Sequence, residues 1–114
     1  MRILIIEDEK QNAELYKEYI EYKFKKELTI DIASDPSVIS VTGKYYDIII
    51  TDYSVLDNKT KKIMKDQYVN NLIIFSGHDN SKDTELAEKY IWLSKQHLQY
   101  FADYIDSRLC AIAS

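Results

Sequence analysis

The chain has 114 residues, of which 46% are hydrophobic and 30% are charged, as expected for one soluble globular domain spanning residues 1–114 with its own hydrophobic core. The net charge of −4 argues against nonspecific nucleic-acid binding, and the single cysteine excludes an internal disulfide and a cysteine metal cluster. The apolar residues at the start are too few for a signal peptide or a membrane span, and the cysteine usage favours a reducing, cytoplasmic setting.

Apolar runs and amphipathic stretches alternate along the sequence. Residues 47–52 form the clearest run, because consecutive isoleucines lie between two aspartates, as in a strand that is buried on both faces. Helices are predicted where apolar residues recur at helical spacing. In chain order the predicted elements are a strand at 2–6, a helix at 10–26, a strand at 28–33, a short helix at 37–42, a strand at 48–50, a helix at 57–67, a strand at 71–75, a helix at 81–89, a strand at 90–93 and a helix at 96–113.

Capping residues mark several of the predicted helix ends. Residues 34–36 (Ser-Asp-Pro) place a capping side chain before a proline at the first helical position, and Gly43 is expected to end that short helix. Either Ser81 or Asp83 is expected to cap the helix that follows. The last helix has the most regular apolar stripe, formed by Leu98, Phe101, Ile105, Leu109 and Ile112.

The alternation of strands and helices predicts an α/β fold. Five strand–helix units of this length are typical of a parallel sheet with helices on both faces. For five strands we expect the flavodoxin-like (βα)5 three-layer sandwich with strand order 2-1-3-4-5. The strand at 28–33 alternates apolar and polar residues, which indicates a position nearer the edge of the sheet.

Polar side chains follow four of the predicted strands, at the point where each strand ends. Because the carboxyl ends of parallel strands meet at one edge of the sheet, we expect three carboxylates, a hydroxyl and an ammonium to converge there. Carboxylates this close repel, so at least one has a raised pKa unless a cation joins them, and Mg²⁺ prefers such oxygen ligands. The residues are Glu7 and Asp8 after the first strand, Asp52 after the third, Ser76 after the fourth and Lys95 after the fifth.

This group of residues is suited to phosphoryl transfer. A carboxylate beside Mg²⁺ can attack a phosphoryl group and form an aspartyl phosphate. Lys95 would neutralise charge on the transferring oxygens, and Ser76 would donate a hydrogen bond to one of them. Ordinary structural explanations also exist: Asp52 can open a turn, Lys95 can be a solvated lysine, and the acidic pair at 7–8 can begin a helix.

At these strand ends the sequence resembles the receiver domain of bacterial two-component response regulators. The resemblance covers nearly the whole chain. Each matching segment is a weak signal alone, but their order, each at a predicted strand end, makes the set fairly specific. The segments are residues 3–9 (ILIIEDE), 47–52 (DIIITD), 73–77 (IIFSG) and 91–95 (IWLSK).

The resemblance implies a role for each matching residue. Asp52 corresponds to the phosphoacceptor, Asp8 to the acidic residue that binds Mg²⁺ directly, and Glu7 to its acidic neighbour, which usually acts through water. Ser76 corresponds to the switch hydroxyl, and Lys95 to the lysine that contacts the phosphoryl group.

The resemblance extends to three positions around the acceptor. The backbone carbonyl of Ser54 corresponds to the main-chain metal ligand. Trp92 corresponds to the switch aromatic that moves inward on activation, although a core position explains it equally well. Ser54 and His78 correspond to variable positions that tune autodephosphorylation, and His78 also fits a plain surface loop.

The sequence departs from the family pattern near the site. Gln96 stands where many members have a proline after the lysine, and residues 55–57 lack the usual proline after the acceptor. The intervals of 24 residues from Asp52 to Ser76 and 19 from Ser76 to Lys95 are short, so trimmed helices are expected between them. These departures leave the acidic site intact but leave the switch surface, and hence the partner, undetermined.

The resemblance implies a stand-alone receiver domain that signals through protein–protein contacts. It would take a phosphoryl group from a sensor histidine kinase or phosphotransfer protein onto Asp52, catalysing only its own phosphorylation and dephosphorylation, and would act on a downstream protein target. No output domain, direct nucleic-acid contact or membrane contact is expected, and a homodimer is left open. One alternative is a pseudo-receiver that keeps the fold and is not phosphorylated. The other is a flavodoxin-like domain for a nucleotide or flavin, which the lack of a Gly-rich phosphate loop disfavours.

Overall fold

A five-stranded parallel sheet forms the centre of the protein. The computed structural model describes residues 1–24, 27–39, 45–69, 71–77 and 83–113. The strand order is β2-β1-β3-β4-β5, which confirms the predicted flavodoxin-like topology. The strands are β1 (Arg2–Ile6), β2 (Thr29–Ala33), β3 (Ile48–Asp52), β4 (Leu72–Ser76) and β5 (Ile91–Ser94).

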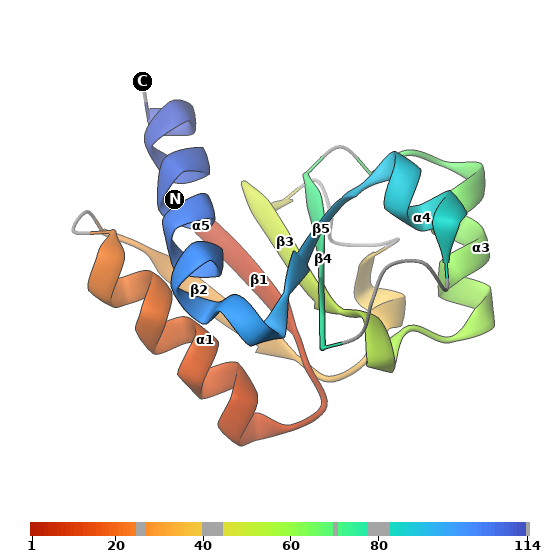
Figure 1. Cartoon of the computed structure of the whole chain (residues 1–114), viewed down its shortest axis with the longest axis horizontal. Helices are drawn as coiled ribbons and strands as arrows, with labels where there is room; N and C mark the ends of the chain where they lie inside the picture. Colours follow the sequence, from red (N-terminus) through yellow and green to blue (C-terminus); the bar gives the residue numbers. More distant parts are fainter. Residues whose placement is uncertain (25–26, 40–44, 70, 78–82, 114) are drawn as a thin grey trace.

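Helices cover both faces of this sheet (Figure 1). The helices α1 (Lys10–Lys23) and α5 (Leu98–Ala113) pack side by side on one face. The helices α3 (Asn58–Asp66) and α4 (Thr84–Lys89) lie together on the opposite face. Short 3-10 turns occur at η1 (Pro36–Val38), η3 (Tyr53–Val55) and η5 (Lys95–His97), and no helix in the described ranges is long and apolar enough to cross a membrane.

The two faces of the sheet carry separate hydrophobic cores, because successive strand residues point in opposite directions. This explains why the central strands are unbroken apolar runs, while β2, which is exposed along one edge, alternates. The core under α1 and α5 includes Ile3, Ile5, Tyr16, Ile50, Phe75, Phe101 and Ile105. The core under α3 and α4 includes Leu4, Ile6, Ile49, Met64, Ile74 and Leu86.

The helix boundaries differ slightly from the predicted ones, and side-chain caps explain most of the differences. Asp83 is the cap of α4, as one of the two predicted candidates, because its side chain accepts a hydrogen bond from the Leu86 amide. The last helix begins at Leu98 rather than at residue 96, because Ser94 caps the intervening turn η5. The structure describes only the start of the predicted helix at 37–42, where Asp35 caps the turn η1. Gly43, the predicted end of that helix, and Ser81, the other predicted cap of α4, lie outside the described residues.

Candidate functional site

Three of the predicted site residues are buried at the carboxyl edge of the sheet. Glu7 follows β1, Asp52 ends β3 and Ser76 ends β4, and each is no more than 3% exposed to solvent. They come together because β3 lies between β1 and β4 in parallel register, with Ile6 beside Thr51 and Asp52 beside Phe75. Buried polar side chains are costly unless they are paired, so partners for these three groups are expected close by.

Lys95 places a cation between the two buried carboxyl groups. It is the first residue after β5, and its ammonium forms an ion pair with Asp52 Oδ2. The same ammonium lies 3.6 Å from Glu7 Oε2. Lys95 stays partly open to solvent, so the site is accessible from the end of β5.

The two carboxyl groups of this site have pKa values pushed in opposite directions. Burial and the neighbouring Asp52 raise the pKa of Glu7 to about 8. Burial alone would raise the pKa of Asp52 too, but hydrogen bonds from Glu7, Lys95 and the Ser54 amide lower it below its ordinary value. At neutral pH Glu7 is therefore largely protonated, whereas Asp52 is ionised and available as a nucleophile. The raised pKa expected for one of these acids is thus present.

The ammonium of Lys95 keeps its charge in this environment. Burial acts to lower the pKa of Lys95, but its hydrogen bond and charge interaction with Asp52 raise the pKa above the ordinary value. Aromatic rings form part of its surroundings: the Tyr16 and Phe75 ring centroids lie 6.0 and 5.9 Å from Lys95 Nζ. A positive charge therefore faces Asp52 Oδ2.

The other oxygen of Asp52 holds the following turn in place. Oδ1 accepts hydrogen bonds from the Ser54 backbone N–H at 2.9 Å and from Ser54 Oγ at 3.0 Å. This makes Asp52 the cap of η3 and places Ser54 directly beside the Asp52 carboxylate.

The three predicted carboxyl groups differ in their exposure to solvent. Glu7 and Asp52 lie together, whereas the side chain of Asp8 is exposed, although it contributes to the raised pKa of Glu7. Within the ranges described, no three His, Cys, Asp or Glu side chains are grouped closely enough to hold a metal ion.

One atom of the site nevertheless matches the chemistry of a hard cation. Glu7 Oε2 is buried and accepts no hydrogen bond from the described residues, and the Lys95 ammonium, at 3.6 Å, lies just beyond hydrogen-bond distance. Such an oxygen needs either a proton or a cation, and carboxylate oxygens are ligands that Mg²⁺ prefers. The donor set of Glu7, Asp8 and Asp52 therefore fits Mg²⁺ chemically.

Trp92 lies next to the site on β5, and an aromatic residue that the sequence analysis did not single out lies against it. The Tyr53 ring centroid is 5.0 Å from that of Trp92. Trp92 Nε1 is buried and has no hydrogen-bond partner among the residues that the structure describes. The only sequence signal for Tyr53 was an aromatic residue directly after Asp52, in a chain with ten tyrosines. His78 lies outside the described residues, so its predicted position beside the site is not placed.

The chain is similar to known proteins in its three-dimensional structure, whereas comparison of its sequence finds no match. No protein-family model matches the sequence, and no curated protein matches it significantly. The signal receiver domain of a DNA-binding response regulator from Colwellia psychrerythraea 34H superposes with a TM-score of 0.75, covering 96% of this chain and 98% of that one at 19% identity. The fold is that of response regulator receiver domains.

Two further receiver structures differ in their chemistry. The Mn²⁺-bound form of response regulator Rcp1 matches with a TM-score of 0.68 and 14% identity, over 93% of this chain and 89% of that chain. An atypical orphan response regulator, described as having a phosphorylation-independent regulatory mechanism, matches with a TM-score of 0.67 and 15% identity over 96% of each chain. The receiver fold therefore accompanies both metal binding and regulation without phosphorylation.

Proposed function

We propose that this chain acts as a single receiver domain that accepts a phosphoryl group on Asp52. The observation that carries the proposal is the pairing of a buried, ionised Asp52 with the Lys95 ammonium beside a second buried carboxyl. A surface carboxylate would have no need of such a partner. A structural ion pair would not need Glu7, whose burial costs free energy in this position.

The proposed reaction is a direct displacement at phosphorus. A carboxylate oxygen of Asp52 forms a bond to phosphorus while the bond from phosphorus to the donor breaks, and the donor leaves with its bonding electrons. With phosphohistidine the leaving group is the imidazole, and with acetyl phosphate it is acetate. Lys95 stabilises negative charge on the transferring oxygens, and Ser76 at the end of β4 donates a hydrogen bond to one of them.

Mg²⁺ is the proposed cofactor. Glu7, Asp8, Asp52 and the backbone carbonyl of Ser54 would hold it, and when bound it would neutralise charge on the phosphoryl oxygens. Asp8 directly follows Glu7 and interacts with it, and a Mn²⁺-bound response regulator is among the structures that share the fold.

The proposed role is in signalling rather than metabolism. A sensor histidine kinase or phosphotransfer protein would supply the phosphoryl group, and the changed surface would act on a downstream protein in the cytoplasm. The chain would catalyse only its own phosphorylation and dephosphorylation. Neither nucleic acid nor a membrane is a proposed partner, and a homodimer is compatible with this role.

Intact-mass measurement after incubation with acetyl phosphate and Mg²⁺ tests the proposal. The wild-type chain should gain one phosphoryl group, and Asp52→Asn should gain none. The matched control is Asp66→Asn, which changes an exposed aspartate on α3 and should leave labelling unchanged. Undiminished labelling of Asp52→Asn would refute the assignment of the acceptor.

A pseudo-receiver is the second candidate, and one observation favours it. A response regulator that shares the fold is described as having a phosphorylation-independent regulatory mechanism. If the folded wild-type chain gains no mass at any Mg²⁺ concentration, the pseudo-receiver becomes the better assignment.

A further inference from the structure

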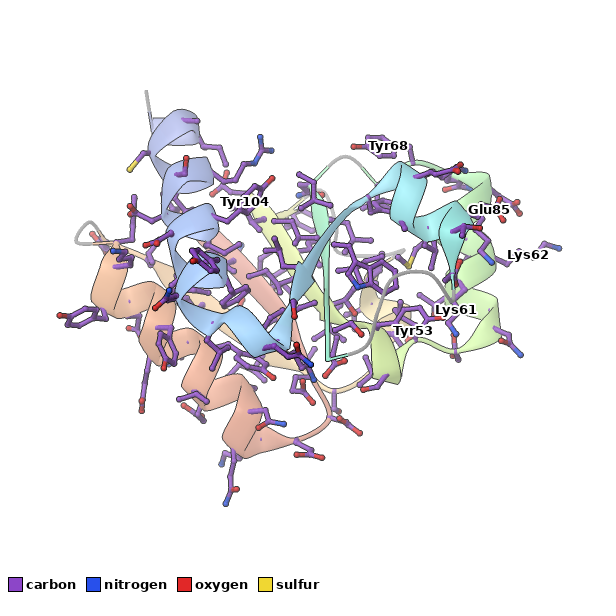
Figure 2. All side chains as sticks on the ribbon, viewed as in Figure 1. Tyr53, Lys61, Lys62, Tyr68, Glu85 and Tyr104 are labelled. Atoms are coloured by element: carbon purple, nitrogen blue, oxygen red, sulfur yellow. The ribbon has the colours of Figure 1, made fainter. Side chains whose placement is uncertain are left out.

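Tyr53 contacts three other parts of the molecule: the N-terminal cap of α4, strand β5 and helix α3. Its hydroxyl donates a hydrogen bond of 3.1 Å to Asp83 Oδ2, and its ring packs against Trp92. The ammonium of Lys61 on α3 lies 4.6 Å from the centroid of the same ring. Figure 2 shows Tyr53 and Lys61 close together beneath α4, on the face of the sheet that α3 and α4 cover.

The first link runs from the acceptor to Tyr53. Tyr53 is the first residue of η3, and the Asp52 carboxylate caps this turn through Ser54. A hydrogen bond to an ionised acceptor is roughly twice as strong as one to a neutral acceptor. In an aspartyl phosphate the negative charge lies on the phosphoryl oxygens, and the carboxyl-derived oxygens become an uncharged carbonyl oxygen and an uncharged bridging oxygen. Phosphorylation of Asp52 therefore weakens the hydrogen bonds that Oδ1 accepts from Ser54.

The second link runs from Tyr53 to α4. Asp83 is the N-terminal cap of α4: Oδ1 accepts from the Leu86 amide at 3.4 Å, while Oδ2 accepts from Tyr53. Lys65 on α3 lies 3.7 Å from the same Asp83 carboxylate. The orientation of this cap thus depends on a hydroxyl that is fixed by the acceptor turn.

We propose that Tyr53 is the positioning residue through which the chemical state of Asp52 reaches the first turn of α4. In the unmodified protein the charged Asp52 holds η3, η3 holds Tyr53, and the Tyr53 hydroxyl holds the Asp83 cap. Loss of the negative charge on the Asp52 carboxyl oxygens loosens η3 and withdraws the Tyr53 hydroxyl, so the first turn of α4 opens more often. The phosphorylated form of this relay rests on the proposed function.

Amide hydrogen exchange over residues 84–87 measures the second link, and its reporting amides are Leu86 and Ala87, whose N–H groups donate to Asp83. Tyr53→Phe keeps the ring against Trp92 but removes the hydroxyl, and loss of a hydrogen bond worth about 1 kcal/mol should speed this exchange about five-fold. Tyr68→Phe is the matched control, because Tyr68 is largely exposed and its ring stacks on Tyr90, also beside α4. Exchange in Tyr53→Phe that equals the wild-type rate would overturn the proposal.

The first link is tested without phosphorylation by a double-mutant cycle. Asp52→Asn removes the charge that caps η3, and it should speed exchange over residues 84–87 in the wild-type background but not in Tyr53→Phe. A merely structural tyrosine predicts additive effects instead, and additive effects would refute the relay.

Excess acetyl phosphate with Mg²⁺ then provides the phosphorylated state, with intact mass recorded on the same samples. If the wild-type chain is labelled, exchange in α4 should rise on labelling, and the rise should disappear in Tyr53→Phe although its mass gain is unchanged. A rise that persists in Tyr53→Phe overturns the relay. Absence of labelling refutes the proposed function, and the double-mutant cycle alone then decides whether the relay exists.

Discussion

Lys95, at the end of the last strand, forms an ion pair with Asp52 across 43 positions of sequence and across the intervening strand β4. The pair assembles only because each partner stands at the carboxyl end of a parallel strand. The nearby Glu7 shares the same ammonium, so one cation serves two buried acids.

Glu7 should make the stability of the metal-free protein depend on pH. Its pKa is raised from 4.5 to about 8 in the folded state, so the folded state binds this proton more tightly than the unfolded state does. The stabilisation is complete below pH 4.5 and is lost as pH rises toward 8, by up to about 1.4 kcal/mol per pH unit.

Urea unfolding in EDTA between about pH 5 and pH 8 measures this effect. The unfolding midpoint of the wild type should fall with pH, and Glu7→Gln, which cannot ionise, should be much flatter. Addition of Mg²⁺ should restore wild-type stability at the upper end of this range. Equal slopes for the wild type and Glu7→Gln would contradict the assignment of the raised pKa to Glu7.

Lys95→Met should slow phosphorylation of Asp52 by acetyl phosphate about a hundredfold, as removal of one preorganised charge partner typically does. The substitution also leaves two buried acids without their cation, so Asp52 should hold a proton more tightly. The rate of mass gain measures the effect. Lys62→Met is the control, because Lys62 is exposed on α3 and points away from the protein (Figure 2); a similar rate for both variants would argue against a role for Lys95.

Trp92 should report metal binding, because it is the only tryptophan and its ring lies 5.0 Å from the ring of Tyr53, the residue after Asp52. Mg²⁺ should change the tryptophan fluorescence, EDTA should reverse the change, and Asp52→Asn should reduce it. Identical spectra with and without Mg²⁺ would instead favour the pseudo-receiver.

Phe101→Ala should destabilise the fold by about 3 to 5 kcal/mol, as expected for truncation of a buried aromatic side chain. Phe101 is 1% exposed and stacks on Phe75 with ring centroids 4.3 Å apart. Denaturant unfolding measures the loss. Tyr100→Ala, at a position that is 61% exposed on the same helix, should cost much less.

The strand ends were predictable because burial on both faces leaves a signal in sequence. The isoleucines at 48–50 stop where polar residues resume, and β3 extends to Asp52. Given the parallel order, the positions of Glu7, Asp52, Ser76 and Lys95 at one edge followed from topology.

The η3 turn and the contacts of Tyr53 depend on individual side-chain hydrogen bonds, which the spacing of apolar residues in the sequence does not predict. The η3 turn exists because an aspartate oxygen bonds the backbone two residues ahead, and turn residues allow this without requiring it. The hydrogen bond from Tyr53 to Asp83 joins residues 30 positions apart, and nothing in the local sequence pattern indicates it. The exposure of Asp8 depends on its side-chain orientation, which the strand pattern does not determine.

The place of β5 at the edge of the sheet has a consequence for synthesis of the chain. A ribosome makes Asp52 well before it makes Lys95, and β5 pairs only with β4, so the ammonium reaches the acceptor last. Until then Asp52 lacks the Lys95 cation, and the carboxylate is in the wrong electrostatic setting for phosphoryl transfer. An unfinished chain therefore lacks the Asp52–Lys95 ion pair, which forms only when β5 completes the sheet.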